Sequence, residues 1–238
     1  MLPYFYEFLG TALLIVFGSG VVANVLLPES KGRHGGWIVI TFGWAIGVFI
    51  GVYASSGVSG GHLNPAVTLT MAYLGRISWS MVTGYLLAQV AGAFTGAVLT
   101  WLMYKKHFDR ADDPDAIRAI FCTAPAIRSY GWNFLTEMLA TFIFMLGVLN
   151  LASPASDMGS LNALPVALLV LGIGLSLGGP TGYAINPARD LGPRIAHFLL
   201  PIPGKKGSDW KYAWVPIVGP IVGGALATTV YHFMQGIA

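Results

Sequence analysis

The sequence predicts an all-α membrane protein with six transmembrane helices and two re-entrant half-helices, arranged as an inverted repeat. Of the 238 residues, 55% are hydrophobic and only 10% are charged, whereas a soluble domain has about 25% charged residues. The tripeptide Asn-Pro-Ala occurs twice, at 64–66 and at 186–188, and each copy precedes a short helix-compatible segment. Such a segment cannot cross a hydrocarbon core about 30 Å thick, because a helix rises about 1.5 Å per residue.

Six long apolar runs are the expected spans. They cover 5–27, 37–55, 81–104, 132–151, 163–177 and 213–234. Five are near spanning length, whereas 163–177 is short and is expected to begin before Asn162. Tryptophans lie at or near the run ends, as an interfacial aromatic belt predicts. These are Trp37, Trp79, Trp101, Trp132, Trp210 and Trp214. The polar stretch 105–131 is expected to be a surface loop with a turn of helix.

The chain is expected to form one transmembrane domain over 1–238, with two related halves. Repeat one covers about 1–104, a loop follows at about 105–131, and repeat two covers about 132–238. Glu7 aligns with Glu137, and the segment 89–92 aligns with 220–223. Each repeat holds three spans, an odd number, so the second enters the membrane upside down. Inverted repeats place a functional site near the middle of the membrane, at their interface.

The two Asn-Pro-Ala copies are expected to start two half-helices that point at each other. Asn is a good N-cap and Pro is favoured at the first helical position. The positive helix ends and the Asn N–H groups then converge, which favours a neutral oxygen-bearing solute and repels cations. The motif residues are Asn64, Pro65, Ala66, Asn186, Pro187 and Ala188. The expected acceptors are the carbonyls of Gly60, Gly61, His62, Leu63, Gly182, Tyr183, Ala184 and Ile185.

Two segments carry a specific resemblance to a known family. They are Ser-Gly-Gly-His-Leu-Asn-Pro-Ala-Val-Thr at 59–68 and Gly-Tyr-Ala-Ile-Asn-Pro-Ala-Arg-Asp-Leu-Gly-Pro-Arg at 182–194. Over essentially its whole length the chain resembles the major intrinsic protein family, the aquaporins and aquaglyceroporins. The resemblance implies a right-handed aquaporin-like bundle, one pore per chain and a homotetramer. It further implies a multi-pass protein of the cell (plasma) membrane with both termini in the cytoplasm.

The resemblance also implies a selectivity filter formed by Trp44, Gly174, Tyr183 and Arg189. Gly174 is expected to leave width, and Trp44 and Tyr183 to form an apolar corner for a carbon backbone. Arg189 and the carbonyls would then form hydrogen bonds with hydroxyl groups. An apolar corner opposite hydrogen-bonding groups suits glycerol. From the residues alone, packing of Trp44 and Tyr183 within the bundle is the alternative interpretation.

Further positions resemble those of glycerol-conducting members, with one departure. The matching residues are Asp190, Arg194, Pro216 and Ile217. Tyr183 matches a position at which the resembling glycerol facilitators have Phe. The added hydroxyl is expected to make the constriction more polar and tighter. The glycerol-to-water ratio is therefore left open, and urea, dihydroxyacetone or a protonated short hydroxy acid are further candidate solutes.

Two carboxylates, Glu7 and Glu137, occupy equivalent positions in predicted spans. By itself an embedded carboxylate indicates a proton-coupling site. The resemblance instead implies a structural role for both, in which each accepts N–H bonds from a re-entrant loop, and a structural role for His62. Gln89 is expected to make a packing or loop contact. The single cysteine, Cys122, is either an exposed reactive thiol or a buried small apolar residue.

The distribution of charge disagrees with the topology that the resemblance implies. On the side of the termini the loops hold only Arg76 among basic residues. The opposite loops hold Lys31, Arg33, Lys105, Lys106, Arg110, Arg118, Arg128, Arg194, Lys205, Lys206 and Lys211. The positive-inside rule places such residues in the cytoplasm. We follow the resemblance, because the rule is statistical and many of these charges lie in long loops near acidic residues.

The expected function is a passive channel for glycerol, water and other small uncharged solutes, which excludes ions and protons. Its partners are these solutes and the lipid bilayer, with no cofactor, no metal, no enzymatic chemistry and no nucleic-acid footprint. One alternative is a secondary active transporter, since inverted repeats with broken helices also build those. Others are a channel mainly for water or a protonated short hydroxy acid, and a non-conducting structural protein.

Overall fold

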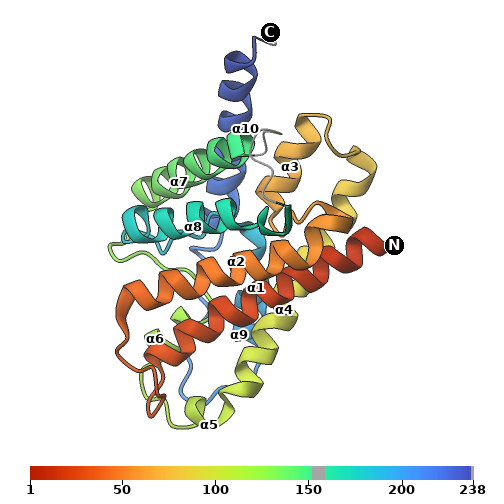
Figure 1. Ribbon diagram of the computed structural model, residues 1–238. Helices are drawn as coiled ribbons and strands as arrows, with labels where there is room; N and C mark the ends of the chain where they lie inside the picture. The colour runs from red at the N-terminus through yellow and green to blue at the C-terminus, as the bar shows by residue number, and fades with distance from the viewer. Residues whose placement is uncertain (152–158, 237–238) are drawn as a thin grey trace.

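The computed structural model describes residues 1–151 and 159–236, and every regular element in that part is a helix (Figure 1). The elements are α1 (Leu2–Leu26), α2 (Gly36–Ser59), α3 (Pro65–Tyr73), α4 (Trp79–Met103), α5 (Lys105–Phe108), α6 (Pro114–Ala119), α7 (Tyr130–Leu151), the 3-10 turn η2 (Gly159–Leu161), α8 (Leu164–Leu177), α9 (Pro187–Leu199) and α10 (Val215–Met234). The all-helical membrane fold expected from the sequence is confirmed.

Five of these helices, α1, α2, α4, α7 and α10, are long and apolar enough to cross a membrane. They coincide with five of the six expected spans. The remaining span is represented by α8, which has 14 residues and is preceded by η2. The helix α8 itself begins at Leu164, after Asn162, so the earlier start expected for this span is not found for the helix; residues 152–158 lie outside the described residues.

The helices pack as two groups, one from each half of the chain. In the first half α1 packs against α2 and α4, and in the second α7 packs against α8 and α10. Close approach is possible because a glycine lies at each equivalent crossing. A Cβ at Gly92 of α4 would lie 2.3 Å from the Phe8 carbonyl oxygen, and one at Gly223 of α10 would lie 2.2 Å from that of Met138. The alignment of 89–92 with 220–223 thus corresponds to equivalent contacts.

The half-helices join the two halves. α3 has 9 residues and packs against α10, whereas α9 has 13 residues and packs against α4. Each begins with the expected cap: Asn64 Oδ1 accepts from the Ala66 N–H at 2.9 Å, and Asn186 Oδ1 accepts from the Ala188 N–H at 3.0 Å. A proline follows each cap at the first helical position, where no N–H partner is needed.

The stretch 105–131, expected to be a surface loop with a turn of helix, contains more regular structure than that. It contains α5 and α6, which lie at the lower end of the view, away from the C-terminus (Figure 1). Phe108, Ile117, Ile120 and Phe121 from this stretch are fully or almost fully buried. It therefore forms a folded cap over one end of the bundle.

Cys122 lies within this cap and is buried, so the apolar alternative for this residue is confirmed. Burial raises the pKa of the Cys122 thiol to about 12. Since the thiolate is the reactive species, a raised pKa keeps the thiol protonated and unreactive at neutral pH.

We expect a maleimide to leave Cys122 unlabelled in the folded protein at neutral pH and to label it after denaturation in SDS. The matched control is Ile127→Cys in a Cys122→Ala background, because Ile127 is 80% exposed. This variant should label readily without denaturant. Equal labelling rates at the two positions in folded protein would contradict the buried placement of Cys122. Mass spectrometry of the intact protein gives the labelled fraction.

Candidate functional site

The tips of the two half-helices meet through a reciprocal pair of hydrogen bonds. Asn64 Nδ2 donates to the Ile185 carbonyl oxygen at 2.8 Å, and Asn186 Nδ2 donates to the Leu63 carbonyl oxygen at 2.8 Å. The residues that supply these carbonyls, Leu63 and Ile185, adopt positive φ angles of 50° and 43°. This left-handed backbone is unusual for branched residues and persists only where the surroundings enforce it. Each Asn amide retains a second N–H.

The loop that precedes each half-helix donates hydrogen bonds to a carboxylate on the first span of the same repeat. Glu7 accepts the His62 and Leu63 N–H groups at 2.9 and 2.7 Å. Glu137 accepts the Ala184 and Ile185 N–H groups, both at 3.0 Å. Both carboxylates are buried. The equivalence of Glu7 and Glu137 seen in the sequence thus appears as equivalent hydrogen bonding.

The first repeat adds a side-chain network around Glu7. The Ser59 hydroxyl donates to Glu7 at 2.6 Å, and Gln89 Nε2 donates to Glu7 and to the Thr68 hydroxyl at 2.7 and 2.8 Å. Thr68 Oγ1 also lies 3.1 Å from His62 Nδ1. A hydroxyl has one proton and two lone pairs, so Thr68 accepts from Gln89 and still forms this contact with either tautomer of the imidazole. Gln89, for which a packing or loop contact was expected, therefore joins α4 to Glu7 of α1 and Thr68 of α3.

A cavity of about 360 Å³ runs past the meeting point. The expected site residues on its wall are Trp44, Gly60, Gly61, His62, Leu63, Asn64, Tyr183, Ala184, Ile185, Asn186 and Arg189. Six others are not part of the described wall: Pro65, Ala66, Gly174, Gly182, Pro187 and Ala188. The Leu63 and Ile185 carbonyls already accept one bond each from the opposite Asn, so they offer less to a solute than the remaining loop carbonyls.

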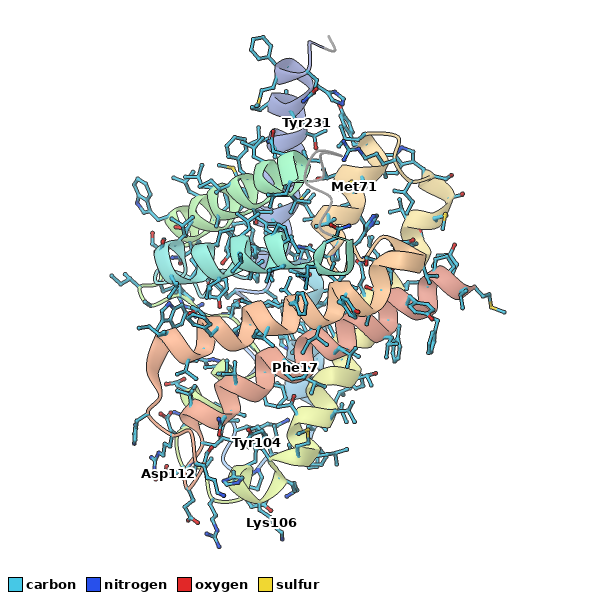
Figure 2. All side chains as sticks on the ribbon, viewed as in Figure 1. Phe17, Met71, Tyr104, Lys106, Asp112 and Tyr231 are labelled. Atoms are coloured by element: carbon cyan, nitrogen blue, oxygen red, sulfur yellow. The ribbon has the colours of Figure 1, made fainter. Side chains whose placement is uncertain are left out.

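Most of the apolar wall of the cavity was not predicted. From α2 it comprises Val48 and Val52, and from α3 Met71; α7 and α8 add Phe144, Val148, Val166 and Val170. In Figure 2, Met71 lies toward the upper end of the view, far from Lys106 and Asp112 of the cap, so the cavity reaches well into the half away from the cap. A spacing of four residues on α2, from Trp44 through Val48 and Val52 to Ser56, is the helical signal that predicts this face.

Arg189 and Trp44 lie next to each other on the cavity wall. The Arg189 guanidinium carbon lies 4.1 Å from the centre of the Trp44 ring, a cation–π contact. Within residues 1–151 and 159–236, no side-chain hydrogen bond occupies the Arg189 guanidinium. Its N–H donors therefore remain available to whatever enters the cavity.

Tyr183 also lies on the cavity wall, and Gly174 lies next to its ring, outside the described wall. A Cβ at Gly174 would lie 2.9 Å from Tyr183 Cζ and 3.0 Å from Tyr183 Oη, so Gly174 provides width by making room for the ring. The Tyr183 hydroxyl is buried and has no partner among the described residues. It therefore adds no polar surface to the cavity in this conformation, and the more polar constriction expected from Tyr183 is not observed.

The four positions of the glycerol-conducting pattern lie outside the cavity wall. Asp190 and Arg194 form a fully buried ion pair with a 2.7 Å contact between Nε and Oδ2. Asp190 also accepts the N–H and hydroxyl of Thr123, and Arg194 donates to the Ser208 carbonyl. Pro216 is buried and Ile217 is half-buried, both in the first turn of α10. The ion pair thus fixes α9 to the cap and to the loop before α10, contacts that the sequence did not reveal.

The family model described as major intrinsic protein matches residues 3–231. A probable glycerol uptake facilitator protein of Thermotoga maritima is 56% identical over 98% of this chain and 100% of that protein. A glycerol uptake facilitator protein of Bacillus subtilis is 50% identical over 98% of this chain and 84% of that protein. The crystal structure of the aquaglyceroporin from Plasmodium falciparum superposes with a TM-score of 0.87, at 31% identity, over 97% of this chain and 94% of that one.

We expect Asp190→Asn to destabilise the protein by about 3 kcal/mol, because removing one partner leaves a buried charge unpaired. The matched control is Asp115→Asn, which breaks the Arg118 ion pair where the Asp115 side chain is 71% exposed. An exposed pair of this kind contributes about 0–1 kcal/mol. Thermal unfolding in detergent should show a marked fall in Tm for Asp190→Asn only. Equal shifts for the two variants would contradict the anchoring role of Asp190.

Proposed function

The chain belongs to the major intrinsic protein family, and we propose that it is a passive transmembrane channel for glycerol, water and other small uncharged solutes. The observation that carries this proposal is the mixed wall of the cavity. The wall combines apolar side chains with Arg189, the Asn64 and Asn186 amides and loop carbonyls. Relatives that match nearly the whole chain are named as glycerol uptake facilitators, which supports glycerol as the solute.

Glycerol matches this wall because its hydroxyls and its carbon chain need different surroundings. Trp44, Val48 and Val52 offer an apolar face to the carbons. Arg189 and the remaining Asn64 and Asn186 N–H groups donate to the hydroxyl oxygens, while free loop carbonyls accept the hydroxyl protons. A solute that keeps its hydrogen bonds on one side and its apolar contacts on the other loses little on leaving water.

Ions and protons are excluded by the same groups. The N-termini of α3 and α9 carry partial positive charge toward the cavity, and Arg189 adds a full charge in a poorly solvated place. A cation meets repulsion there. A water molecule whose oxygen accepts from both Asn amides cannot easily accept a proton from a neighbouring water, so proton relay is interrupted.

The secondary active transporter has little support in the contacts. Such a protein needs a coupling-ion site, for which the embedded carboxylates are the candidates. Glu7 and Glu137 are occupied by loop N–H groups, and Asp190 is occupied by Thr123 and Arg194. We therefore assign Glu7 and Glu137 structural roles and the solute flux a passive character, without enzymatic chemistry.

We further propose a homotetramer in the cell membrane with both termini in the cytoplasm. The basic cap then faces outward, against the positive-inside rule. Neutralisation of many of its charges supports this orientation. Lys105, Arg110, Arg118 and Arg128 pair with Asp109, Glu29, Asp115 and Asp209, and Lys205 donates to three carbonyls at the end of α9.

The proposal is tested by stopped-flow light scattering of proteoliposomes under osmotic shocks with sucrose, glycerol, urea and lactic acid at several pH values. We expect rapid water flux and glycerol flux that is linear in its gradient and independent of pH and sodium. Saturating or ion-dependent flux would instead support a transporter. Flux of water alone, or of lactic acid alone at acidic pH, would identify one of the narrower channels.

Arg189→Val and Asn64→Asp are each expected to raise cation or proton leak, because each removes positive potential or a donor from the cavity wall. A pH-sensitive dye inside proteoliposomes, with an imposed potential, measures the leak. Arg33→Val, at an exposed arginine of the loop between α1 and α2, is the matched control and should leave the leak at the wild-type level. Unchanged leak in both Arg189→Val and Asn64→Asp would count against the assigned roles.

A further inference from the structure

Trp37 makes a contact that an interfacial tryptophan does not need. It lies in the first turn of α2 and is 41% exposed, which fits the aromatic belt expected from the sequence. Its indole Nε1 nevertheless donates to the Gly174 carbonyl oxygen at 2.9 Å, across 137 positions of the chain. Gly174 lies in the last turn of α8, where carbonyls have no intrahelical partner. Trp37 therefore caps the end of the helix that supports the constriction.

The same indole also packs against Tyr183. The two rings meet edge to face, with centroids 5.8 Å apart and an interplanar angle of 81°. This geometry is favourable for aromatic pairs because the positive edge of one ring faces the negative face of the other. Trp37 thus contacts both Gly174 and Tyr183.

Gly178 marks the point at which these groups converge. A Cβ there would lie 2.4 Å from Tyr183 Cδ1, 2.7 Å from the Gly174 carbonyl oxygen and 2.8 Å from Trp37 Cζ2. At the other end of the phenol ring, a Cβ at Gly174 would meet Cζ and Oη at 2.9 and 3.0 Å. The Tyr183 ring therefore lies in a slot whose outer wall is Trp37.

We propose that Trp37 is a positioning residue for the constriction: it holds the Tyr183 ring against α8 and so limits the width of solute that passes beside Arg189. The inference rests on the proposed channel function. Without the indole, the Tyr183 ring can move back from the cavity into the vacated space. Wider solutes gain most from that movement, so the effect is on selectivity more than on total flux.

The test compares Trp37→Phe and Trp37→Ala with wild type in proteoliposomes, using glycerol and the four-carbon polyol erythritol. Discrimination between solutes that differ by one carbon is about tenfold or more per group in a fitted pocket, so we expect Trp37→Ala to raise the erythritol-to-glycerol ratio by about threefold to tenfold. Trp37→Phe, which keeps a ring and loses the N–H, should give a smaller rise. The matched control Trp132→Ala, at a tryptophan that is 71% exposed in the first turn of α7, should leave the ratio unchanged.

A second pair of variants separates positioning from a general loss of structure. Gly178→Ala should push the Tyr183 ring toward the cavity and lower glycerol flux by about tenfold to a hundredfold, since misplacement of a fitted group by about an ångström can cost about a hundredfold. Gly179→Ala is the control, because no atom lies within 4 Å of a Cβ there. Trp37→Ala added to Gly178→Ala should restore glycerol flux, since the ring regains room.

The outcomes distinguish this inference from the proposed function. An unchanged erythritol-to-glycerol ratio in both Trp37 variants, with wild-type glycerol flux intact, overturns the inference alone. Failure of Trp37→Ala to restore flux in the Gly178→Ala background does the same. A wild-type protein that conducts neither glycerol nor erythritol overturns the proposed function and, with it, this inference.

Discussion

The structure depends on the meeting of two helix tips inside the bundle, where no bulk water is available to satisfy backbone groups. The Asn64 amide donates to the Ile185 carbonyl and the Asn186 amide donates to the Leu63 carbonyl, so two backbone acceptors at the meeting point are satisfied. This arrangement also requires that both loops turn through left-handed backbone just before each helix begins. Because the partners are reciprocal, each loop fixes the conformation of the other at the cavity wall.

The two halves stabilise these loops through equivalent carboxylates, but the contacts that surround the two half-helices differ. Glu7 and Glu137 accept equivalent N–H pairs from the loops. Thr68 and Asp190 occupy the same position of the repeat, four residues after their Asn. In the first repeat Thr68 closes an internal network with Gln89. In the second, Asp190 and Arg194 anchor α9 to the cap, so the helix that carries Arg189 is fixed at both ends.

The central site was predictable because its signals are local and occur twice. Cap residues, short helices and embedded carboxylates can be identified in one repeat and checked in the other. The role of Trp37 and the cap contacts of Asp190 were not predictable, since they join residues far apart in the chain. The burial of the Tyr183 hydroxyl was not predictable, because the ring is surrounded by Gly174, Gly178 and Trp37, which are far from it in the sequence or lack a side chain. The burial of the cap was missed because its Phe108 and Phe121 are scattered among charged residues.

A crystal or cryo-EM structure in the presence of glycerol, at a resolution that defines side-chain amides, tests the central claim most directly. The account predicts Asn64 Nδ2 and Asn186 Nδ2 within hydrogen-bond distance of the opposite loop carbonyls, near the 2.8 Å found here. It also predicts glycerol in single file past them, with its carbons toward Trp44. Separated helix tips, or a passage that is closed between Asn64 and Asn186, would contradict the account.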